Sequence, residues 1–450
     1  MTVPEEHVRS VPNLVTLATP ARTSGPPSPM EARLEGEDVR VPGPFDGSLF
    51  LAPAAAAADI APARAPRGEY LPFSPPSIGE EEIASVVDAL RSPWISTGPQ
   101  ARRFEAEFAS YLGAPAALAL NSCTAGLHTA LVALGVGDGD EVITTTMTFT
   151  SSVNVIEHVR ARPVLVDVEP DTMNIDPARV EAAITPRTKV ILPVHFAGHP
   201  AELDPLRDLA RAHGCVLLED AAHALPARYR GELIGAGGNP VAFSFYATKN
   251  LTTAEGGMLT GAPDLVDRAR VLSLHGMSRD AWKRYSKNGS WRYEVVAPGF
   301  KYNMTDMQAA LGLCQLRRLP SFQERRREVV AAYDAAFAGC AALELPARRP
   351  YVEHAWHLYV LRVRPEALDI GRDQFISELT ERNIGTSVHF IPVHLHPYYR
   401  DRYGYLPESF PNALAAFERI ISLPLHPGLT SDDVEDVISA VLDVVRAHRR

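Results

Sequence analysis

Short apolar segments alternate with amphipathic segments between about residues 115 and 220. The apolar segments are typical of buried strands, and the segments between them repeat apolar residues every three or four positions, as helices do. The expected strands are Ala116–Leu120, Glu141–Thr146, Pro163–Val168, Lys189–His195 and Cys215–Glu219. The expected helices are Thr124–Leu134, Ser151–His158, Pro177–Ile184 and Leu203–His213. This alternation predicts an α/β fold with a largely parallel sheet covered on both faces, whose ligands bind at the carboxyl ends of the strands.

A different pattern begins near Pro320. There we expect three helices, at Phe322–Phe337, Asp373–Arg382 and Ser431–Arg446. We also expect a strand at His357–Val363 and a strand-like run at Thr386–Phe390. These elements predict a smaller α+β domain. The expected organisation is therefore a leader at 1–68, a large α/β domain at 69–319 and a small domain at 320–450.

The first 68 residues differ in composition from the rest of the chain. They hold 11 of the 38 prolines and the run Ala54–Ala58. Such a segment buries too little apolar area to offset the entropy of ordering it, so we expect it to be disordered. The alternative is an arm that docks a partner or directs localisation.

Charge and cysteine content exclude several classes of protein. The formal net charge is −10, which does not favour a general basic surface for nucleic acid or anionic lipid. The four cysteines are far apart and form no C-x-x-C pair, which argues against a zinc ribbon or a disulfide framework. No basic-then-apolar signal opens the chain, and no apolar run approaches the roughly 20 residues of a membrane helix. We therefore expect a cytoplasmic protein without nucleic-acid or membrane partners.

Two segments place polar residues at the carboxyl ends of expected strands. Asn121–Gly126 lies between a strand and a helix, where free backbone N–H groups and the helix dipole can hold a phosphate. The alternative is a simple helix cap by Ser122 or Thr124. Asp220 follows the strand at Cys215–Glu219 and could pair with a protonated heteroaromatic nitrogen; the alternative is a cap or a structural ion pair.

A single lysine follows an apolar strand and precedes a glycine turn. Lys249 is flanked by Phe245, Tyr246, Leu251 and Met258. Most lysines are solvated surface groups, but desolvation here would lower the pKa of Lys249 and make a neutral, nucleophilic amine available. A phosphate turn, a strand-end carboxylate and a lysine, in this order, are the parts of a pyridoxal phosphate site. In such a site the lysine forms the Schiff base and the carboxylate keeps the pyridine nitrogen protonated.

Six motifs, in this order, resemble the DegT/DnrJ/EryC1/StrS family. They are Leu71–Ser74 with Ser96–Pro99, Asn121–Ala125, Glu219–His223, Ser244–Leu251, Glu255–Gly257 and Lys301–Asp306. The resemblance covers about residues 70–450. It implies a fold-type-I pyridoxal phosphate enzyme with a mostly parallel seven-stranded sheet and a smaller C-terminal domain. Members of this family aminate keto groups of nucleotide sugars, in polysaccharide or secondary-metabolite biosynthesis.

The resemblance also implies roles for individual residues. Lys249 would bind the cofactor covalently and shuttle the proton, and Asp220 would pair with the pyridine nitrogen. The backbone N–H groups of Thr124 and Ala125 and the hydroxyl of Ser244 would bind the cofactor phosphate. Phe149 would stack on the pyridine ring, and His223 would lie beside the cofactor. Without the resemblance, Phe149 would be read as a core residue. Asn303 would reach the phosphate of a neighbouring subunit, which implies a homodimer with shared active sites.

The retained lysine favours transamination, because some relatives that carry histidine there act as sugar dehydratases. The expected donor is L-glutamate and the expected acceptor is a nucleotide-linked keto-sugar. The stretch His389–Tyr399 resembles the branch of the family that aminates C4 rather than C3, and His389 would lie near the sugar or its nucleotide. The alternatives are a 3-keto-sugar aminotransferase, another fold-type-I reaction such as elimination, and a non-catalytic regulator that binds pyridoxal phosphate.

Two further clusters admit more than one interpretation. His389, His394 and His396 could suggest a metal, but no carboxylate or cysteine completes such a site, and we expect none. A basic and aromatic stretch precedes Asn303 and could bind a nucleotide diphosphate or form an exposed loop. This stretch consists of Trp282, Arg284, Tyr285, Lys287, Trp291 and Arg292.

Overall fold

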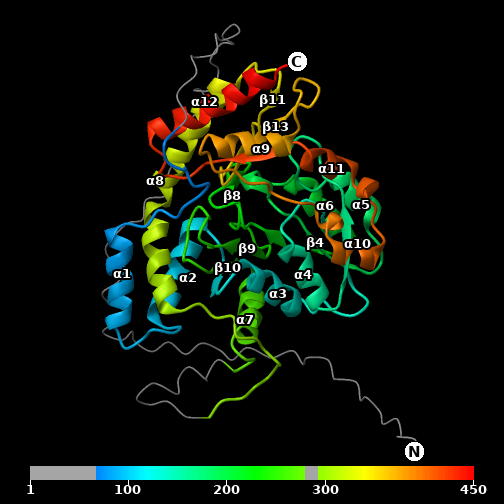
Figure 1. Cartoon of the computed structure of the whole chain (residues 1–450). Coiled ribbons are helices and arrows are strands. Elements are labelled where there is room, and N and C mark those ends of the chain that lie inside the picture. Colours follow the sequence, from blue (N-terminus) through cyan, green and yellow to red (C-terminus); the bar gives the residue numbers. More distant parts are fainter. Residues whose placement is uncertain (1–66, 279–291) are drawn as a thin grey trace, which may run out of the picture. The chain divides into compact units, whose positions relative to one another are not determined.

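The structure is a computed structural model, and it describes residues 67–278 and 292–450 (Figure 1). The expected leader lies outside these residues, apart from its last two positions. So does most of the basic and aromatic stretch, of which only Arg292 is described. The described residues fall in one compact unit.

Two four-stranded sheets form the centre of the α/β region. The first has the order β3-β2-β4-β5 and is parallel throughout, and the second has the order β1-β10-β9-β6, in which only β6 and β9 are parallel. Leu218 alone separates β5 from β6, and a parallel bridge joins Val194 to Asp220. The strands are β1 (Ala117–Leu120), β2 (Glu141–Thr145), β3 (Arg162–Val166), β4 (Thr188–Leu192), β5 (Val216–Leu217), β6 (Glu219–Asp220), β9 (Val241–Ser244) and β10 (Gly257–Thr260).

The helices predicted between these strands are confirmed to within two residues. They are α3 (Cys123–Ala133), α4 (Ser151–His158), α5 (Pro177–Ala183) and α6 (Leu203–His213). Local sequence sets their ends: Ser122 caps α3, Asp176 caps α5, and Gly214 ends α6 in the left-handed conformation. Three further helices complete the region: α1 (Glu80–Arg91), α2 (Pro99–Leu112) and α7 (Pro263–Leu272).

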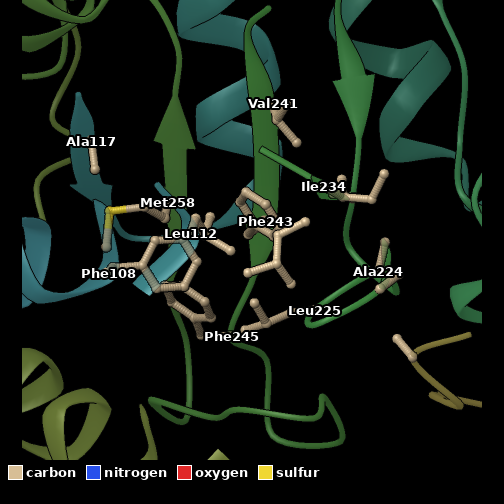
Figure 2. Packing of buried hydrophobic residues seen from close by; sticks show 14 of the residues in the cluster. Phe108, Leu112, Ala117, Ala224, Leu225, Ile234, Val241, Phe243, Phe245 and Met258 are labelled. Carbon is tan, nitrogen blue, oxygen red and sulfur yellow. The ribbon is translucent and has the colours of Figure 1, made fainter. Parts of the chain in front are cut away.

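A dense apolar cluster supports the second sheet from one side (Figure 2). Phe108 and Phe245 pack edge to face with ring centroids 5.5 Å apart, and Phe108 meets Phe243 in the same way at 5.2 Å. All three rings are fully buried. Because Phe243 and Phe245 flank Ser244 along the chain, this packing fixes the strand end from which Ser244 and Lys249 follow.

A second core joins the C-terminal elements. The antiparallel sheet β11-β13-β14 packs with three helices, and its residues form a cluster separate from the one in Figure 2. The elements are β11 (Leu343–Glu344), β13 (Tyr359–Val363), β14 (Ile420–Leu423), α8 (Asp306–Phe337), α9 (Arg372–Glu381) and α12 (Ser431–His448). This agrees with the expected α+β pattern; the division at residues 319 and 320 remains a prediction.

One predicted helix start and one predicted strand of this region are wrong. The helix expected at Phe322–Phe337 begins at Asp306 and continues through Pro320. Its first half packs against α1 and α2 (Figure 1), which outweighs the hydrogen bond lost at the proline. The run Thr386–Phe390 is not a strand, and only Ser387 forms an isolated bridge, to Ser422.

Short elements complete the described chain. They are β7 (Arg228–Tyr229), β8 (Glu232–Leu233), β12 (Val352–Glu353), α10 (Pro397–Tyr403), α11 (Pro411–Phe417), and the 3-10 helices η3 (Phe196–Gly198), η5 (Val393–Leu395) and η6 (Pro407–Ser409). Within residues 67–278 and 292–450, no helix combines the length and the apolar character needed to span a membrane.

Candidate active site

A cavity of about 470 Å³ opens where the strands of the α/β region end. Its walls come from the segments after β2, β4, β6 and β9 and from the segment that contains His389. Seven of the residues expected at the site line it: Thr124, Phe149, Asp220, His223, Ser244, Lys249 and His389. Ala125 and Asn303 are not part of its wall.

The amino end of α3 forms one wall of the cavity. Ser122 Oγ accepts the N–H of Ala125 at 3.0 Å, so the helix cap considered from the sequence is present. Gly257 of β10 lies directly against this turn, because a Cβ at Gly257 would be 2.4 Å from the carbonyl carbon of Ser122. The first-turn N–H groups have no intrahelical acceptor and carry the positive end of the helix dipole, which suits a phosphate.

Asp220 presents a buried carboxylate at the floor of the cavity. It is 3% exposed and accepts hydrogen bonds from Ser152 Oγ at 2.7 Å and from the N–H of Ala222 at 3.0 Å. Among the described residues, no basic side chain lies within ion-pair distance of it. Both donors are neutral, so the charge of this carboxylate calls for a cation from a bound group.

Lys249 faces the same cavity with an amine that loses its proton easily. Burial lowers the pKa of Lys249 from 10.5 to about 8, and the nearby Cys123 and Asp220 act weakly in the opposite direction. No carboxylate in the described part of the chain forms an ion pair with Nζ. About a tenth of the amine is therefore neutral at pH 7, far more than in an ordinary lysine, and this is the form that a nucleophile requires.

Aromatic rings and imidazoles form the remaining wall. Phe149 is 61% exposed, so the interpretation as a core residue is wrong, and its ring leaves a face open beside Phe390. His223 is buried and stacks on Phe390, with centroids 5.7 Å apart. His389 stacks on Phe73, and its Nδ1 lies 2.9 Å from Ser422 Oγ.

Burial keeps both imidazoles at the cavity neutral. Burial and the charge of Lys249 lower the pKa of His389 to about 4 and hold that of His223 well below 6.5. Nδ1 of His223 is buried and has no hydrogen-bond partner in the described part of the protein. The cavity wall is therefore polar but carries no imidazolium charge at neutral pH.

These features fit pyridoxal phosphate. The buried carboxylate of Asp220, which has no ion-pair partner among the described residues, suits a protonated pyridine nitrogen. The amine of Lys249, with its lowered pKa, suits attack on the aldehyde carbon. The open face of Phe149 matches the ring, and the turn before α3 matches the phosphate. The predicted residues thus supply each kind of contact that this cofactor needs.

Several residues of the site were not predicted, among them Cys123, Ser152, His357 and Phe390. Ser152 binds Asp220, and Cys123 Sγ lies 3.8 Å from the same carboxylate. His357 and Phe390 enclose His223 from two sides. Position relative to a motif could have indicated Cys123 and Phe390, which adjoin Thr124 and His389, whereas no local signal marks Ser152 or His357.

Other predicted residues lie apart from the cavity. Asn303 donates to Thr97 Oγ1 at 2.5 Å, near the start of α8. His394 is buried and hydrogen-bonds to Thr146 and to the carbonyl of Pro407, so it does not converge with His389. Within the described ranges, no three His, Cys, Asp or Glu side chains are grouped to hold a metal ion.

Known proteins share this fold and sequence pattern. The sequence profile of the DegT/DnrJ/EryC1/StrS aminotransferase family matches residues 76–442. The spore coat polysaccharide biosynthesis protein SpsC of Bacillus subtilis (strain 168) is 53% identical over 382 residues, which cover 84% of this chain and 98% of SpsC.

Solved structures agree with this assignment. Spr1654 of Streptococcus pneumoniae, a proposed sugar aminotransferase, is 40% identical in its PMP form, with a TM-score of 0.79 over 84% of this chain and 99% of that one. Its PLP form is also known. The sugar aminotransferase CalS13 of Micromonospora echinospora is 31% identical, with a TM-score of 0.75 over 83% and 99% of the two chains.

The fold and the cavity define a fold-type-I enzyme that uses pyridoxal phosphate. The chain belongs to the DegT/DnrJ/EryC1/StrS aminotransferase family. It is therefore a pyridoxal phosphate-dependent sugar aminotransferase, and the expected family, fold type and cofactor are confirmed.

Proposed function

We propose that this enzyme transfers an amino group from L-glutamate to the C4 keto group of a nucleotide-linked deoxysugar, in the biosynthesis of a glycan or a secondary metabolite. The cavity that joins Lys249 to Asp220 carries the proposal. SpsC, a relative of this enzyme, is a spore coat polysaccharide biosynthesis protein, and this supports a sugar as the acceptor of the amino group. The resemblance of His389–Tyr399 to the 4-keto branch supports the position.

The cofactor would be held by residues from four segments. The backbone N–H of Thr124 and the hydroxyl of Ser244 would bind the phosphate, and the N–H of Ala125, which donates to Ser122 Oγ in this structure, would share its hydrogen with the phosphate. Asp220 would hold the positive charge of the pyridine nitrogen, and Phe149 would stack on the ring. When bound, pyridoxal phosphate accepts an amino group from one substrate, stores it and delivers it to the other.

Proton transfer would fall to Lys249. Its Nζ has a pKa of about 8, so it can both take a proton from the substrate carbon and return one near neutral pH. Ser152 and the N–H of Ala222 both donate to Asp220 and would hold its oxygens in place as acceptors for the ring nitrogen. His223 would lie beside the cofactor as a neutral hydrogen-bonding group.

Absorbance of the purified protein with pyridoxal phosphate tests the first half of this function. We expect L-glutamate to bleach the yellow band and release 2-oxoglutarate, and Lys249→Ala to abolish both responses. A protein that binds the cofactor but ignores L-glutamate would refute the proposed donor. Pyruvate or an oxobutyrate formed from an amino acid without a keto-sugar would favour an elimination reaction instead.

A second assay tests the position of amination. The enzyme charged with L-glutamate is offered dTDP- and UDP-linked 4-keto-6-deoxyhexoses and their 3-keto isomers. We expect an amino sugar only from the 4-keto compounds. Turnover confined to the 3-keto compounds would overturn the proposed position while leaving the sugar aminotransferase class intact.

We also propose a homodimer in which Asn303 completes the active site of the neighbouring subunit. Mixing Lys249→Ala chains with Asn303→Ala chains tests this. If each active site combines Lys249 of one subunit with Asn303 of the other, a mixed dimer has one site with both residues replaced and one intact site. Mixed chains should then recover about a quarter of the wild-type activity. No recovery in mixed dimers would mean that both residues serve one subunit.

A further inference from the structure

The loop before β13 is held rigidly where it reaches the cavity. The N–H of Ala355 donates to the carbonyl of Gly198 at 2.9 Å. The buried guanidinium of Arg326 donates to the carbonyls of Trp356, at 3.1 Å, and of Leu425, at 2.7 Å. His357, the next residue of the loop, is 4% exposed and lines the cavity.

Asn250 fixes the protonation of this imidazole. Both hydrogens of its side-chain amide point to backbone carbonyls, those of Leu225 and Ala355, at 2.8 Å each. Carbonyls only accept, so the amide oxygen must be the atom that lies 3.2 Å from Nδ1 of His357. An amide oxygen also only accepts, and Nδ1 therefore carries the proton.

The other nitrogen of His357 is then an acceptor. Nε2 has no hydrogen-bond partner among residues 67–278 and 292–450, yet it is not sealed from the cavity. Burial holds the pKa of His357 well below 6.5. The neighbouring His223 and His389 and the charges of Lys249 and Arg326 lower this pKa further. The ring of His223 lies 4.4 Å from it, centroid to centroid, and is neutral as well.

We propose that His357 is a specificity-determining residue, whose Nε2 accepts a hydrogen bond from a hydroxyl group of the sugar substrate and disfavours a carboxylate at the same place. The inference rests on the proposed function, because it assumes that an amino acid and a sugar occupy the cavity in turn. A sugar offers hydroxyl donors, whereas a carboxylate offers only acceptors. A fixed acceptor in the wall therefore distinguishes the two substrates.

Nuclear magnetic resonance tests the tautomer without any activity assay. The full-length protein with bound cofactor is labelled with ¹⁵N-histidine, and His357 is assigned by the signal lost in His357→Asn. We expect a protonated Nδ1 and an unprotonated Nε2 across pH 6 to 8. A protonated Nε2 would overturn the proposal.

Two substitutions separate the acceptor from the structural role of the ring. The amide of His357→Asn can still donate to Asn250 but does not reach the cavity, whereas His357→Gln carries an acceptor about as far out as Nε2. We expect His357→Asn to raise KM for the 4-keto-6-deoxyhexose nucleotide about tenfold, while L-glutamate binds at least as well as to the wild type because the acceptor that disfavours its carboxylate is gone. His357→Gln should restore most of the affinity. Equal losses in both half-reactions, or no loss, would refute the proposal.

A charge introduced at the hydrogen-bond partner gives the opposite signature. Asn250→Asp places a carboxylate on Nδ1 and removes the two N–H groups that donate to the carbonyls of Leu225 and Ala355. The same ¹⁵N spectrum shows when His357 has become a cation, which donates from Nε2 and attracts a carboxylate. The L-glutamate concentration that half-bleaches the cofactor should fall several-fold while KM for the sugar rises. Unchanged or weaker L-glutamate binding in a folded variant whose ¹⁵N spectrum shows a cationic His357 would count against the proposal.

Asn174→Asp is the control for a buried Asn-to-Asp change next to a histidine. Asn174 Nδ2 also donates to two carbonyls, those of His199 and Pro200, but it is this nitrogen and not the amide oxygen that lies 3.3 Å from Nδ1 of the buried His199, away from the cavity. It should leave both substrates unaffected. If the wild type uses L-glutamate but no keto-sugar, the proposed acceptor fails, whereas the tautomer and the L-glutamate shift still decide the role of His357.

Discussion

Lys249 and Asp220 face one cavity, but the protein prepares their charges in opposite ways. Asp220 keeps its hydrogen-bond donors, Ser152 and the N–H of Ala222, and therefore stays a fixed acceptor. Lys249 has no ion-pair partner in the described part of the chain and lies in a desolvated place. Hydrogen bonds thus fix the position of one group, while burial lowers the pKa of the other.

The rate of cofactor uptake should follow the amine of Lys249. The pKa of about 8 is lowered by burial, so the neutral form grows as pH rises through that value. We expect the apoprotein to take up pyridoxal phosphate about tenfold faster at pH 9 than at pH 7, as measured by the growth of the yellow absorbance. A rate that instead rises about tenfold per pH unit up to pH 10.5 would show an ordinary lysine.

Ser152 should contribute to cofactor affinity through Asp220. Ser152→Ala removes the hydrogen bond of 2.7 Å to the carboxylate, and we expect the dissociation constant of pyridoxal phosphate to rise about fivefold. Fluorescence titration measures it. Ser85→Ala is the control, since Ser85 hydrogen-bonds the carbonyl of Ala310 on another face of the protein. Equal affinities in the two variants would contradict this role.

The sequence predicts the residues that motifs mark, but not those that reach the cavity from elsewhere. Thr124, Asp220 and Lys249 follow strand ends, so a local pattern places them. His357 and Ser152 depend on how the segment before β13 and the start of α4 pack against β6, which no local pattern states. Phe149 shows the same limit, because an aromatic next to a strand looks buried until the cavity beside it is known.

At the scale of elements, the contact between β10 and α3 positions the expected phosphate site. The backbone of Gly257 touches the turn before α3, and any side chain would displace that turn. The parallel strands and their helices follow from hydrophobic periodicity and are predicted well. The start of α8 is not, because Pro320 resembles a boundary while its tolerance depends on packing against α1 and α2.

Gly257→Ala should therefore affect both stability and binding. A Cβ at this position would be 2.4 Å from the carbonyl carbon of Ser122 and 2.5 Å from the nitrogen of Cys123. We expect the free energy of unfolding to fall by about 2 to 3 kcal/mol, and cofactor affinity to fall with it. Urea unfolding measures the first. Gly237→Ala, which meets open space, should change neither.

For the whole molecule, buried neutral imidazoles make stability depend on pH. Burial lowers the pKa of His128, His389 and His426 to about 4. Their unfolded pKa is near 6.5, so between pH 6.5 and 4 the unfolded chain binds more protons than the folded one. The stabilisation is complete above pH 6.5 and is lost on acidification.

Urea unfolding of the cofactor-bound protein at pH 7.5 and pH 5 checks this. We expect a loss of several kcal/mol at pH 5, with at most about 2 kcal/mol from each of the three imidazoles. His426→Gln should flatten the dependence, whereas His213→Gln, at an exposed position, should not. Equal stability at the two pH values would mean that these rings stay accessible to protons in the folded state.

Tyr246 has a consequence for changing the enzyme by design. Its side chain lines the cavity, is 48% exposed and makes no hydrogen bond or ring contact with the described residues. Because folding does not depend on this ring, a library of substitutions at position 246 could explore new acceptor molecules at little expense in expression yield or heat tolerance. Positions that line a cavity but contribute little to packing are where enzymes diversify most readily, and position 246 is one of them.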